Sequence, residues 1–556
     1  MCPTRKTNGI AGIITTVLSS TALGALNTNP LYLFAGALTN DTRILSVMSD
    51  KKKQEKEDEK RDTDSAMYAQ IMSLKMRTLL KIFLYSVVGP ILLYCLFFSF
   101  LYYQDSLAKV QRKLIETKEK RPSFRIYARS NDTGYLKHVF AVLDRLGFER
   151  TDNDTNWDLL WAHDYPFRAL SSSLSRLQPH QRVNHFPGCG YITNKVDLST
   201  TNGRYNPTAF KIPEQREEFL KYADRYPGKV FLQKSNDHRG ISIKNVSDIN
   251  LTATGSFVQE FIQRPFLVDG YKFDIGVYTV ITSIDPLRVY VYRGDVLFRF
   301  CPVKYYPFDP EVLDKYIVGD DYLPIWNVPS LKHYYSKLKF SMKDSFDAYV
   351  RSRGKDSEKV WQNVREAIKE ITLVKEGHIK EVLKRFGNGR NFFELVRFDF
   401  ALDEDLNVYT MEANMSPNLS SAHYPPNQLL YEQVIYNLFA LVGVGQRVRK
   451  DSLKTRNRME EEMTVADKNL MVLPELCMEC NDCFRVECQL CSPCFTTEIK
   501  LILSQSYLEH QNKMDFQRVF PPPITKDMAL KDYTLKNQLL VRWYQGKCKL
   551  DHSWCS

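Results

Sequence analysis

The sequence predicts a mixed α/β protein whose globular part is preceded by a single transmembrane helix. Apolar residues alternate over short stretches, as in Glu394–Leu402 and Asn407–Ala413, which is typical of β-strands. Between Ser357 and Phe386 they recur instead at three- and four-residue spacing, as on one face of a helix. Ile82–Tyr103 is a run of 22 residues without charge. These three observations define the fold class.

Length and charge limit the class of protein further. The chain has 556 residues, which is enough for more than one hydrophobic core. It carries 76 Lys and Arg against 65 Asp and Glu, giving a formal net charge of +11. Such a charge suits an acidic protein tail, an anionic membrane or a nucleic acid as partner, although an ordinary, mildly basic protein has a similar balance.

The N-terminal region, residues 1–81, is expected to be largely disordered. Ile10–Leu26 is only weakly similar to the apolar part of a signal peptide, because Ser and Thr interrupt it. Residues 50–66 mix both signs of charge with almost no apolar residue, which is typical of a linker that cannot bury a core.

The uncharged run predicts a transmembrane helix over residues 82–103, followed by a juxtamembrane linker over 104–122. At about 1.5 Å per residue the run reaches roughly 33 Å, enough to cross a hydrocarbon core of about 30 Å. Gly89-Pro90 would kink it. The close basic flanks favour a cytosolic C-terminal part, but including Lys51–Arg61 equalises the two sides. We therefore expect a single-pass membrane protein and leave the side of its globular part open.

The two strands around residue 404 bring candidate metal ligands together. In a hairpin Asp399 faces Glu412, and Asn414 lies two residues further along the same face. Two carboxylates and an amide oxygen aimed at one point suit Mg²⁺. The alternative is an edge hairpin whose acidic side chains are simply solvated.

These three residues resemble the metal-binding signature of the tubulin-tyrosine-ligase-like family, an ATP-grasp group, which reads F-D-x-x-x-D followed by E-x-N-x-S-P. Further motifs similar to those of the family follow in the family's order between Asp158 and Leu441, with N-H-F-P-G at 184–188, F-V-Q-E-F-I at 257–262, G-Y-K-F-D at 270–274 and R-F at 299–300. The resemblance implies an ATP-grasp ligase domain over 123–450 that uses ATP and Mg²⁺, with Asp399, Glu412 and Asn414 as the metal ligands.

The resemblance also implies a nucleotide site. Its lysines would meet the phosphates, a loop would fold over them, and the backbone of a hinge segment would grip adenine. Lys272 and Arg299 are the candidate catalytic residues, because both would contact phosphate or substrate. The implied cofactor-binding residues are Lys195, Lys234, Arg239, Gly240, Gln259, Glu260, Phe261, Ile262, Lys272, Asp274 and Asn327.

One position departs from the family pattern. The pattern K-F-D-x-R, with Ile, Leu or Val at x, places an arginine near the γ-phosphate, and here that position is Gly276. Loss of one such donor can slow a reaction about 10²–10³-fold. The resemblance therefore implies that Arg299 or Arg239 compensates, or that the enzyme is slow or inactive.

The tail over 451–556 lies outside the resemblance and is rich in cysteine. Its paired C-x₂-C spacings could bind zinc, whereas an even number of cysteines could equally form disulfides. The eight positions are Cys477, Cys480, Cys483, Cys488, Cys491, Cys494, Cys548 and Cys555. N-x-S/T glycosylation sequons favour disulfides, among them those that begin at Asn131, Asn153, Asn245, Asn250, Asn414 and Asn418.

The resemblance implies an ATP-dependent ligase of the polyglutamylase type. Such an enzyme would phosphorylate a protein carboxylate to an acyl phosphate, which the amine of glutamate then attacks. We expect tubulin or another acidic protein, glutamate and a membrane as partners, and no nucleic acid. Glycine in place of glutamate remains open. The alternative is a lumenal, membrane-anchored pseudo-ligase, or a ligase acting on a protein other than tubulin, because tubulin is cytosolic.

Overall fold

The computed structural model describes residues 72–116, 121–130, 132–235, 241–387, 389–445, 463–525 and 530–556. The chain divides into two compact units, Met1–Lys118 and Glu119–Ser556. Each unit is described by itself.

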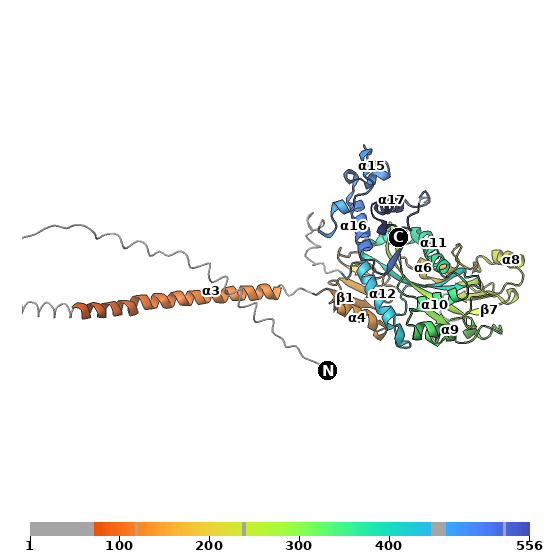
Figure 1. The fold of residues 1–556 in the computed structure, drawn as a ribbon, viewed down its shortest axis with the longest axis horizontal. Coiled ribbons are helices and arrows are strands. Elements are labelled where there is room, and N and C mark those ends of the chain that lie inside the picture. The colour runs from red at the N-terminus through yellow and green to blue at the C-terminus, as the bar shows by residue number, and fades with distance from the viewer. Residues whose placement is uncertain are drawn as a thin grey trace, which may run out of the picture. The chain divides into compact units, whose positions relative to one another are not determined.

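The described part of the first unit is one long helix (Figure 1). Its backbone is helical from residue 72, widens into a π turn at η1 (Leu84–Val88) and continues as α3 (Gly89–Glu116). The π turn directly precedes Gly89-Pro90, where proline cannot donate a backbone hydrogen bond. Gly89–Lys109 is long and apolar enough to cross a membrane, with a mean hydropathy of 1.3. This segment begins later than the expected span of 82–103, and the helix continues into the expected linker.

The second unit begins with a small parallel sheet of order β2-β1-β3-β4. Helical segments η2 (Gly134–Leu136) and α4 (Lys137–Arg145) follow its first strand. The strands are β1 (Ser123–Tyr127), β2 (Glu149–Arg150), β3 (Leu159–Ala162) and β4 (Arg182–Val183).

A second sheet, antiparallel and of order β5-β8-β6-β7, has a separate core with helix α8 (Arg216–Arg225). Phe219 of α8 packs edge to face on Phe231, and α8 and β7 lie together at one end of the unit (Figure 1). The strands are β5 (Ala209–Ile212), β6 (Phe231–Ser235), β7 (Ser242–Lys244) and β8 (Ser256–Glu260).

The central sheet is organised around the twelve-residue strand β9 (Phe273–Ile284). Along one edge, β11 pairs with the first part of β9 and β10 with the last part; β13 pairs along the other edge. The remaining strands are β10 (Leu287–Tyr292), β11 (Leu297–Phe300), β12 (Leu323–Pro324), β13 (Glu394–Leu402), β14 (Val408–Asn414) and β15 (Phe516–Phe520). β13 is buried at every residue, as expected of a strand inside a sheet.

One large hydrophobic core joins the parallel sheet, the central sheet and the long helices. Apolar residues at helical spacing, such as Val360, Trp361 and Val364, form the buried face of α11. Among the described residues from 171 onward, the α-helices are α5 (Ser171–Leu174), α6 (Gly190–Thr193), α7 (Lys195–Ser199), α9 (Pro329–Lys332), α10 (Met342–Ser352), α11 (Glu358–Leu383), α12 (Gln428–Leu441), α15 (Pro474–Met478), α16 (Thr497–Asn512) and α17 (Leu535–Leu550), together with α8 above. The mixed α/β class is confirmed.

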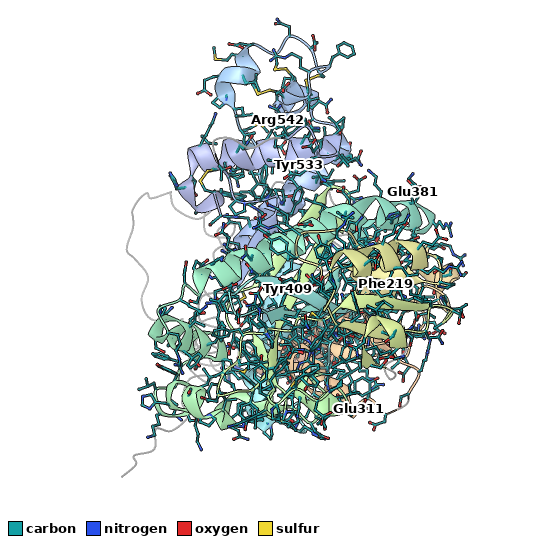
Figure 2. The ribbon with its side chains drawn as sticks, turned by 90° about the vertical axis from the view of Figure 1, so that its right-hand side faces the viewer. Phe219, Glu311, Glu381, Tyr409, Tyr533 and Arg542 are labelled. Atoms are coloured by element: carbon teal, nitrogen blue, oxygen red, sulfur yellow. A yellow bond between two sulfur atoms is a disulfide. The ribbon has the colours of Figure 1, made fainter. Side chains whose placement is uncertain are left out.

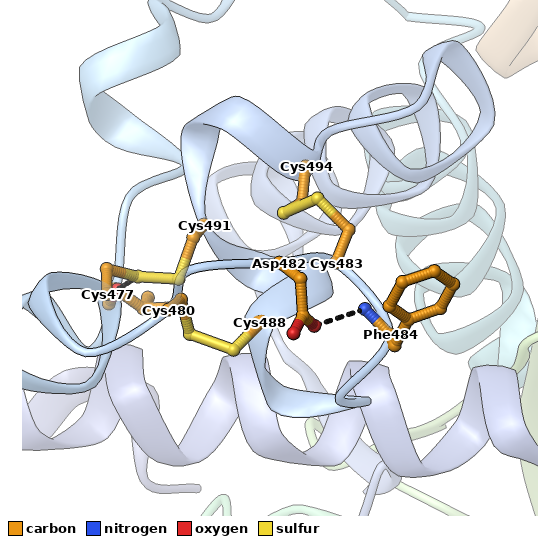
Figure 3. The surroundings of a disulfide bond; sticks show 9 residues. Cys477, Cys480, Asp482, Cys483, Phe484, Cys488, Cys491 and Cys494 are labelled. Carbon is orange, nitrogen blue, oxygen red and sulfur yellow. Dashed lines mark hydrogen bonds between the residues drawn. A yellow bond between two sulfur atoms is a disulfide. The ribbon is translucent and has the colours of Figure 1, made fainter.

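The cysteine-rich segment packs into the same unit. Strand β15 pairs antiparallel with β10 and so forms an edge of the central sheet. The eight tail cysteines form disulfides, not a zinc site. Figure 3 shows the pairs Cys477–Cys491, Cys480–Cys488 and Cys483–Cys494, and the fourth pair is Cys548–Cys555. Figure 2 shows the disulfides beside Arg542 of α17, at one end of the unit.

The contact between this segment and the sheet is polar and buried. Glu509 of α16 accepts hydrogen bonds from Arg288 Nε at 2.9 Å, Tyr290 Oη at 3.0 Å and Thr282 Oγ1 at 3.0 Å. Arg288 is only 2% exposed. The expected domain boundary at residue 450 therefore separates Arg288 from Glu509, which pair within one compact unit.

Candidate active site

The hairpin of β13 and β14 sets Asp399 directly opposite Glu412. Asn414, two residues further on, donates from Nδ2 to Asp399 Oδ2 at 3.0 Å. Asp399 is 2% exposed, whereas Glu412 and Asn414 are half-buried. The alternation of side chains along two paired strands thus brings the three expected metal ligands to one face.

Two arginines hold Asp399 in place. Arg397, on the same strand and the same face, donates from Nε and Nη2 to the two carboxylate oxygens at 2.7 and 2.9 Å. Arg299 of β11 donates to Asp399 Oδ2 at 2.9 Å and grips both oxygens of Asp274 at 2.8–2.9 Å. Burial opposes the charge on Asp399, but Arg397 and Arg299 outweigh it and lower the pKa of its carboxyl group.

The pKa of Asp274 is shifted in the opposite direction from that of Asp399. Burial raises the pKa of Asp274 to about 6, with the nearby charge of Asp399 acting in the same direction and Arg299 opposing it. Asp274 therefore shares one guanidinium with a more acidic neighbour, and the cluster combines two carboxylates with two arginines.

Three lysines lie near these acids. Lys195, at the start of α7, places Nζ 3.3 Å from Glu412 Oε1. Lys234 of β6 donates to Gln259 Oε1 at 3.2 Å, and burial with the charges of Lys272 and Lys195 lowers the pKa of Lys234 to about 8, although Glu412 opposes this. Burial likewise lowers the pKa of Lys272, whose ammonium donates to the carbonyl oxygen of Tyr316. Cations brought together with so little counter-charge favour a polyanionic ligand.

The hinge segment over Gln259–Ile262 lies next to the lysines, since Gln259 is the partner of Lys234. Lys272 Nζ lies 5.7 Å from the centroid of the Phe261 ring. The Glu260 carboxylate is engaged by Lys229 and by Tyr222 Oη at 2.7 Å. The N–H groups of Glu260 and Phe261 donate to Thr208 O and Val230 O, so these two backbone donors are used inside the protein.

The remaining expected residues are less central. Asn327 ends the 3₁₀ turn η5 (Ile325–Asn327), and its side chain is exposed at the outer edge of the sheet. Pro324, three residues earlier, pairs with Arg299 across β12 and β11. Arg239 and Gly240 lie outside the described residues.

Sequence reasoning missed Arg397. Its signal is its place in the chain, because it stands two residues before Asp399 in a strand that is otherwise apolar or acidic. A side chain at that spacing lies on the same face as Asp399. A buried arginine beside a proposed metal ligand is therefore predictable from the strand pattern alone.

A second cluster of potential metal ligands is structural. His185 Nδ1 lies 2.7 Å from Glu394 Oε1, and its Nε2 lies 2.9 Å from the carbonyl oxygen of Ala162. Glu394 Oε2 accepts the N–H of Phe186 at 2.8 Å. Both ring nitrogens and both carboxylate oxygens are thus used in tying β13 to the segment after β4.

The residues of the main cluster fit Mg²⁺ and ATP. The three proposed metal ligands offer only carboxylate and amide oxygens, which a hard cation prefers. Gln259 Nε2 is buried and has no hydrogen-bond partner among the described residues, which points to a ligand acceptor beside the hinge. An acidic hairpin facing clustered lysines is consistent with the phosphate end of an ATP-grasp ligase site.

Comparison with known proteins agrees with this class. The pattern of the tubulin-tyrosine ligase family matches residues 173–451. The probable tubulin polyglutamylase ttll-15 of Caenorhabditis elegans is 41% identical over 447 residues, which cover 77% of this chain and 85% of that protein. The chain belongs to the tubulin-tyrosine ligase family.

Two human relatives are more distant. The tubulin polyglutamylase TTLL7 is 27% identical over 51% of this chain, and the tubulin monoglutamylase TTLL4 is 26% identical over 55%. The matches cover 34% and 26% of the length of these two proteins. The similarity to them is therefore confined to part of each chain.

Proposed function

We propose that this protein is an ATP-dependent ligase that adds glutamate to side-chain carboxylates of an acidic protein. The observation that carries the proposal is the Asp399–Glu412 pair facing Lys195, Lys234 and Lys272 in a chain of this family. Relatives named as polyglutamylases and a monoglutamylase favour glutamate over glycine as the added amino acid.

The reaction needs activation of a poor acylating agent. An oxygen of the acceptor carboxylate attacks the γ-phosphorus of ATP, the bond to the β-phosphate oxygen breaks, and ADP leaves. The amine of glutamate then attacks the carbonyl carbon of the acyl phosphate, phosphate leaves with the bonding electrons, and the amine loses a proton. Mg²⁺, held by Asp399, Glu412 and Asn414, would neutralise phosphate charge. The lysines hold and orient the phosphates, and no protein nucleophile is required.

The names of the relatives favour tubulin as the acceptor, which requires a cytosolic site. The formal charge of +11 is complementary to an acidic tail. In this proposal the protein is anchored through Gly89–Lys109 and carries its second unit on the cytosolic side.

The four disulfides favour a second candidate with the same chemistry, a lumenal ligase that modifies another acidic protein. Disulfides persist in oxidising compartments and are rare in the cytosol. The pairing of β15 with β10 puts them in the same compact unit as the site, so both share one side of the membrane. Among the described residues, four sequon asparagines are exposed, namely Asn153, Asn245, Asn250 and Asn418.

Full-length protein in detergent, with labelled glutamate and acidic tail peptides, tests the chemistry. We expect incorporation only when both ATP and Mg²⁺ are present, and loss of incorporation after chelation, because phosphate charge would go unneutralised. Labelled glycine is the control for the amino acid. Incorporation that survives chelation, or that requires no ATP, contradicts the proposal.

Full-length protein in cells tests the side of the membrane. If the second unit is lumenal, the tail cysteines should resist alkylation until a reductant is added, and endoglycosidase treatment should increase gel mobility. A variant with Asn153, Asn245, Asn250 and Asn418 changed to Gln is the matched control and should show a smaller mobility shift, because it keeps the remaining sequons. Freely alkylated cysteines and an unglycosylated chain would overturn the lumenal candidate and leave tubulin as the acceptor.

A further inference from the structure

Gly276 lies in the centre of the site, on the stretch of β9 between β11 and β13. It is paired with Leu297 on one side and with Asp399 on the other. A Cβ atom added at Gly276 would lie 2.9 Å from Arg397 Cδ, 3.3 Å from Arg397 Nε and 3.3 Å from Asp399 Oδ1. The space that a side chain at position 276 would enter is therefore filled by Arg397.

Arg397 reaches this space from the neighbouring strand. Its backbone pairs with Tyr278, two residues beyond Gly276 on β9, and its side chain leans over the glycine toward Asp399. The side chain is 7% exposed, and its two hydrogen bonds to Asp399 fix the plane of the guanidinium. Neighbouring strands lie about 4.8 Å apart, so a side chain as long as arginine can reach from its own strand over the next one.

With Arg397 in the space at position 276, the cluster holds equal numbers of positive and negative charges. Arg299 and Arg397 face Asp274 and Asp399. An additional arginine at 276 would crowd a third guanidinium into the same buried space and leave it without a partner carboxylate. Glycine at 276 and arginine at 397 therefore depend on each other, because glycine leaves free the space that the Arg397 side chain occupies.

We propose that Arg397 supplies, from β13, the guanidinium that the family pattern places at position 276 on β9, and that it contacts the γ-phosphate of bound ATP. Gly276 is then a rearrangement of the site and not a loss of function. Arg299 donates to both oxygens of Asp274 and to one of Asp399, whereas Arg397 donates to Asp399 alone and occupies the space at position 276. A planar, always charged fork is suited to a phosphoryl group on which charge develops.

The test uses full-length variants and compares the Mg²⁺ complexes of ADP and of a non-hydrolysable ATP analogue. Arg397→Ala should weaken the triphosphate complex more than the ADP complex, and so lose, by about tenfold or more, the preference for the triphosphate. Arg397→Lys should keep part of the preference, since it keeps the charge without the fork. Arg385→Ala, in which an exposed arginine is removed, is the matched control.

The decisive test is a variant in which the residues at 276 and 397 are exchanged. Gly276→Arg alone should lower the melting temperature, because its side chain meets Arg397. Gly276→Arg combined with Arg397→Gly should restore the triphosphate preference that Arg397→Ala loses, and a ligase rate that falls about 10²–10³-fold in Arg397→Ala should recover with it. A purely structural role for Arg397 predicts equal weakening of both nucleotides and no recovery.

The inference rests on the nucleotide site of the proposed function, but not on its acceptor. If wild type shows the triphosphate preference and no ligation, the proposed function fails, and the Arg397 variants still decide the assignment of Arg397. The assignment is overturned if folded Arg397→Ala keeps the preference, if the exchange variant does not recover it, or if wild type shows none.

Discussion

Glu509→Ala is expected to lower the free energy of unfolding of the second unit by about 3–5 kcal/mol. The substitution leaves Arg288, which is 2% exposed, as a buried charge whose carboxylate partner is gone. It also removes the acceptor of Tyr290 Oη and Thr282 Oγ1. Chemical denaturation followed by fluorescence would measure the change.

The control for this variant lies on the same helix. Glu498 of α16 is 65% exposed in its side chain and pairs with Lys536 Nζ at 2.6 Å. Glu498→Ala should change the free energy of unfolding by no more than about 1 kcal/mol, because exposed ion pairs contribute little. Equal effects of the two substitutions would show that the buried contact does not hold the cysteine-rich segment to the sheet.

Glu412→Gln is expected to reduce turnover at least about 10²-fold and to weaken Mg²⁺-dependent nucleotide binding. Removing groups that merely orient metal ligands already costs about 10–100-fold, and Glu412 is a proposed ligand itself. The variant should remain folded, since Glu412 is half-buried and its ion pair with Lys195 is the partly exposed one of the cluster. Turnover, nucleotide titration and a thermal melt would be measured together.

Glu381→Gln serves as the matched control, because the side chain of Glu381 is 68% exposed and is paired with Lys384 on the surface. It should leave all three measurements unchanged. If folded Glu412→Gln turned over at the wild-type rate, Glu412 would not be a metal ligand. The proposed site would then lack a second carboxylate opposite Asp399 in the hairpin.

Local patterns predicted the elements that carry the site. The strand expected at Glu394–Leu402 has those bounds, and the strand expected at Asn407–Ala413 is observed one residue later, at Val408–Asn414. The helix expected between Ser357 and Phe386 is α11 with the turn that follows it. These features depend on neighbours in the chain, namely alternation, helical spacing and an acidic turn.

Contacts between distant segments could not be predicted in this way. The cysteine spacing left zinc and disulfides open, and nothing local shows that Phe516–Phe520 pairs with Leu287–Tyr292. Gly276 was interpreted as a missing charge because a linear motif compares one position at a time. The side chain that fills its space comes from a strand about 120 residues later in the chain, a relation that only the paired strands make visible.

The edge position of β15 has a consequence for biosynthesis. Arg288 and Glu509 are 221 residues apart in the chain, so β10 emerges from the ribosome long before α16 and β15. At about 5–20 residues per second, β10 would wait roughly 10–45 s with an unpaired edge and an unneutralised arginine. An open strand edge is a template for pairing with other chains. The nascent protein should therefore depend on a chaperone during this interval, and its ligase site should mature only after translation has passed residue 520.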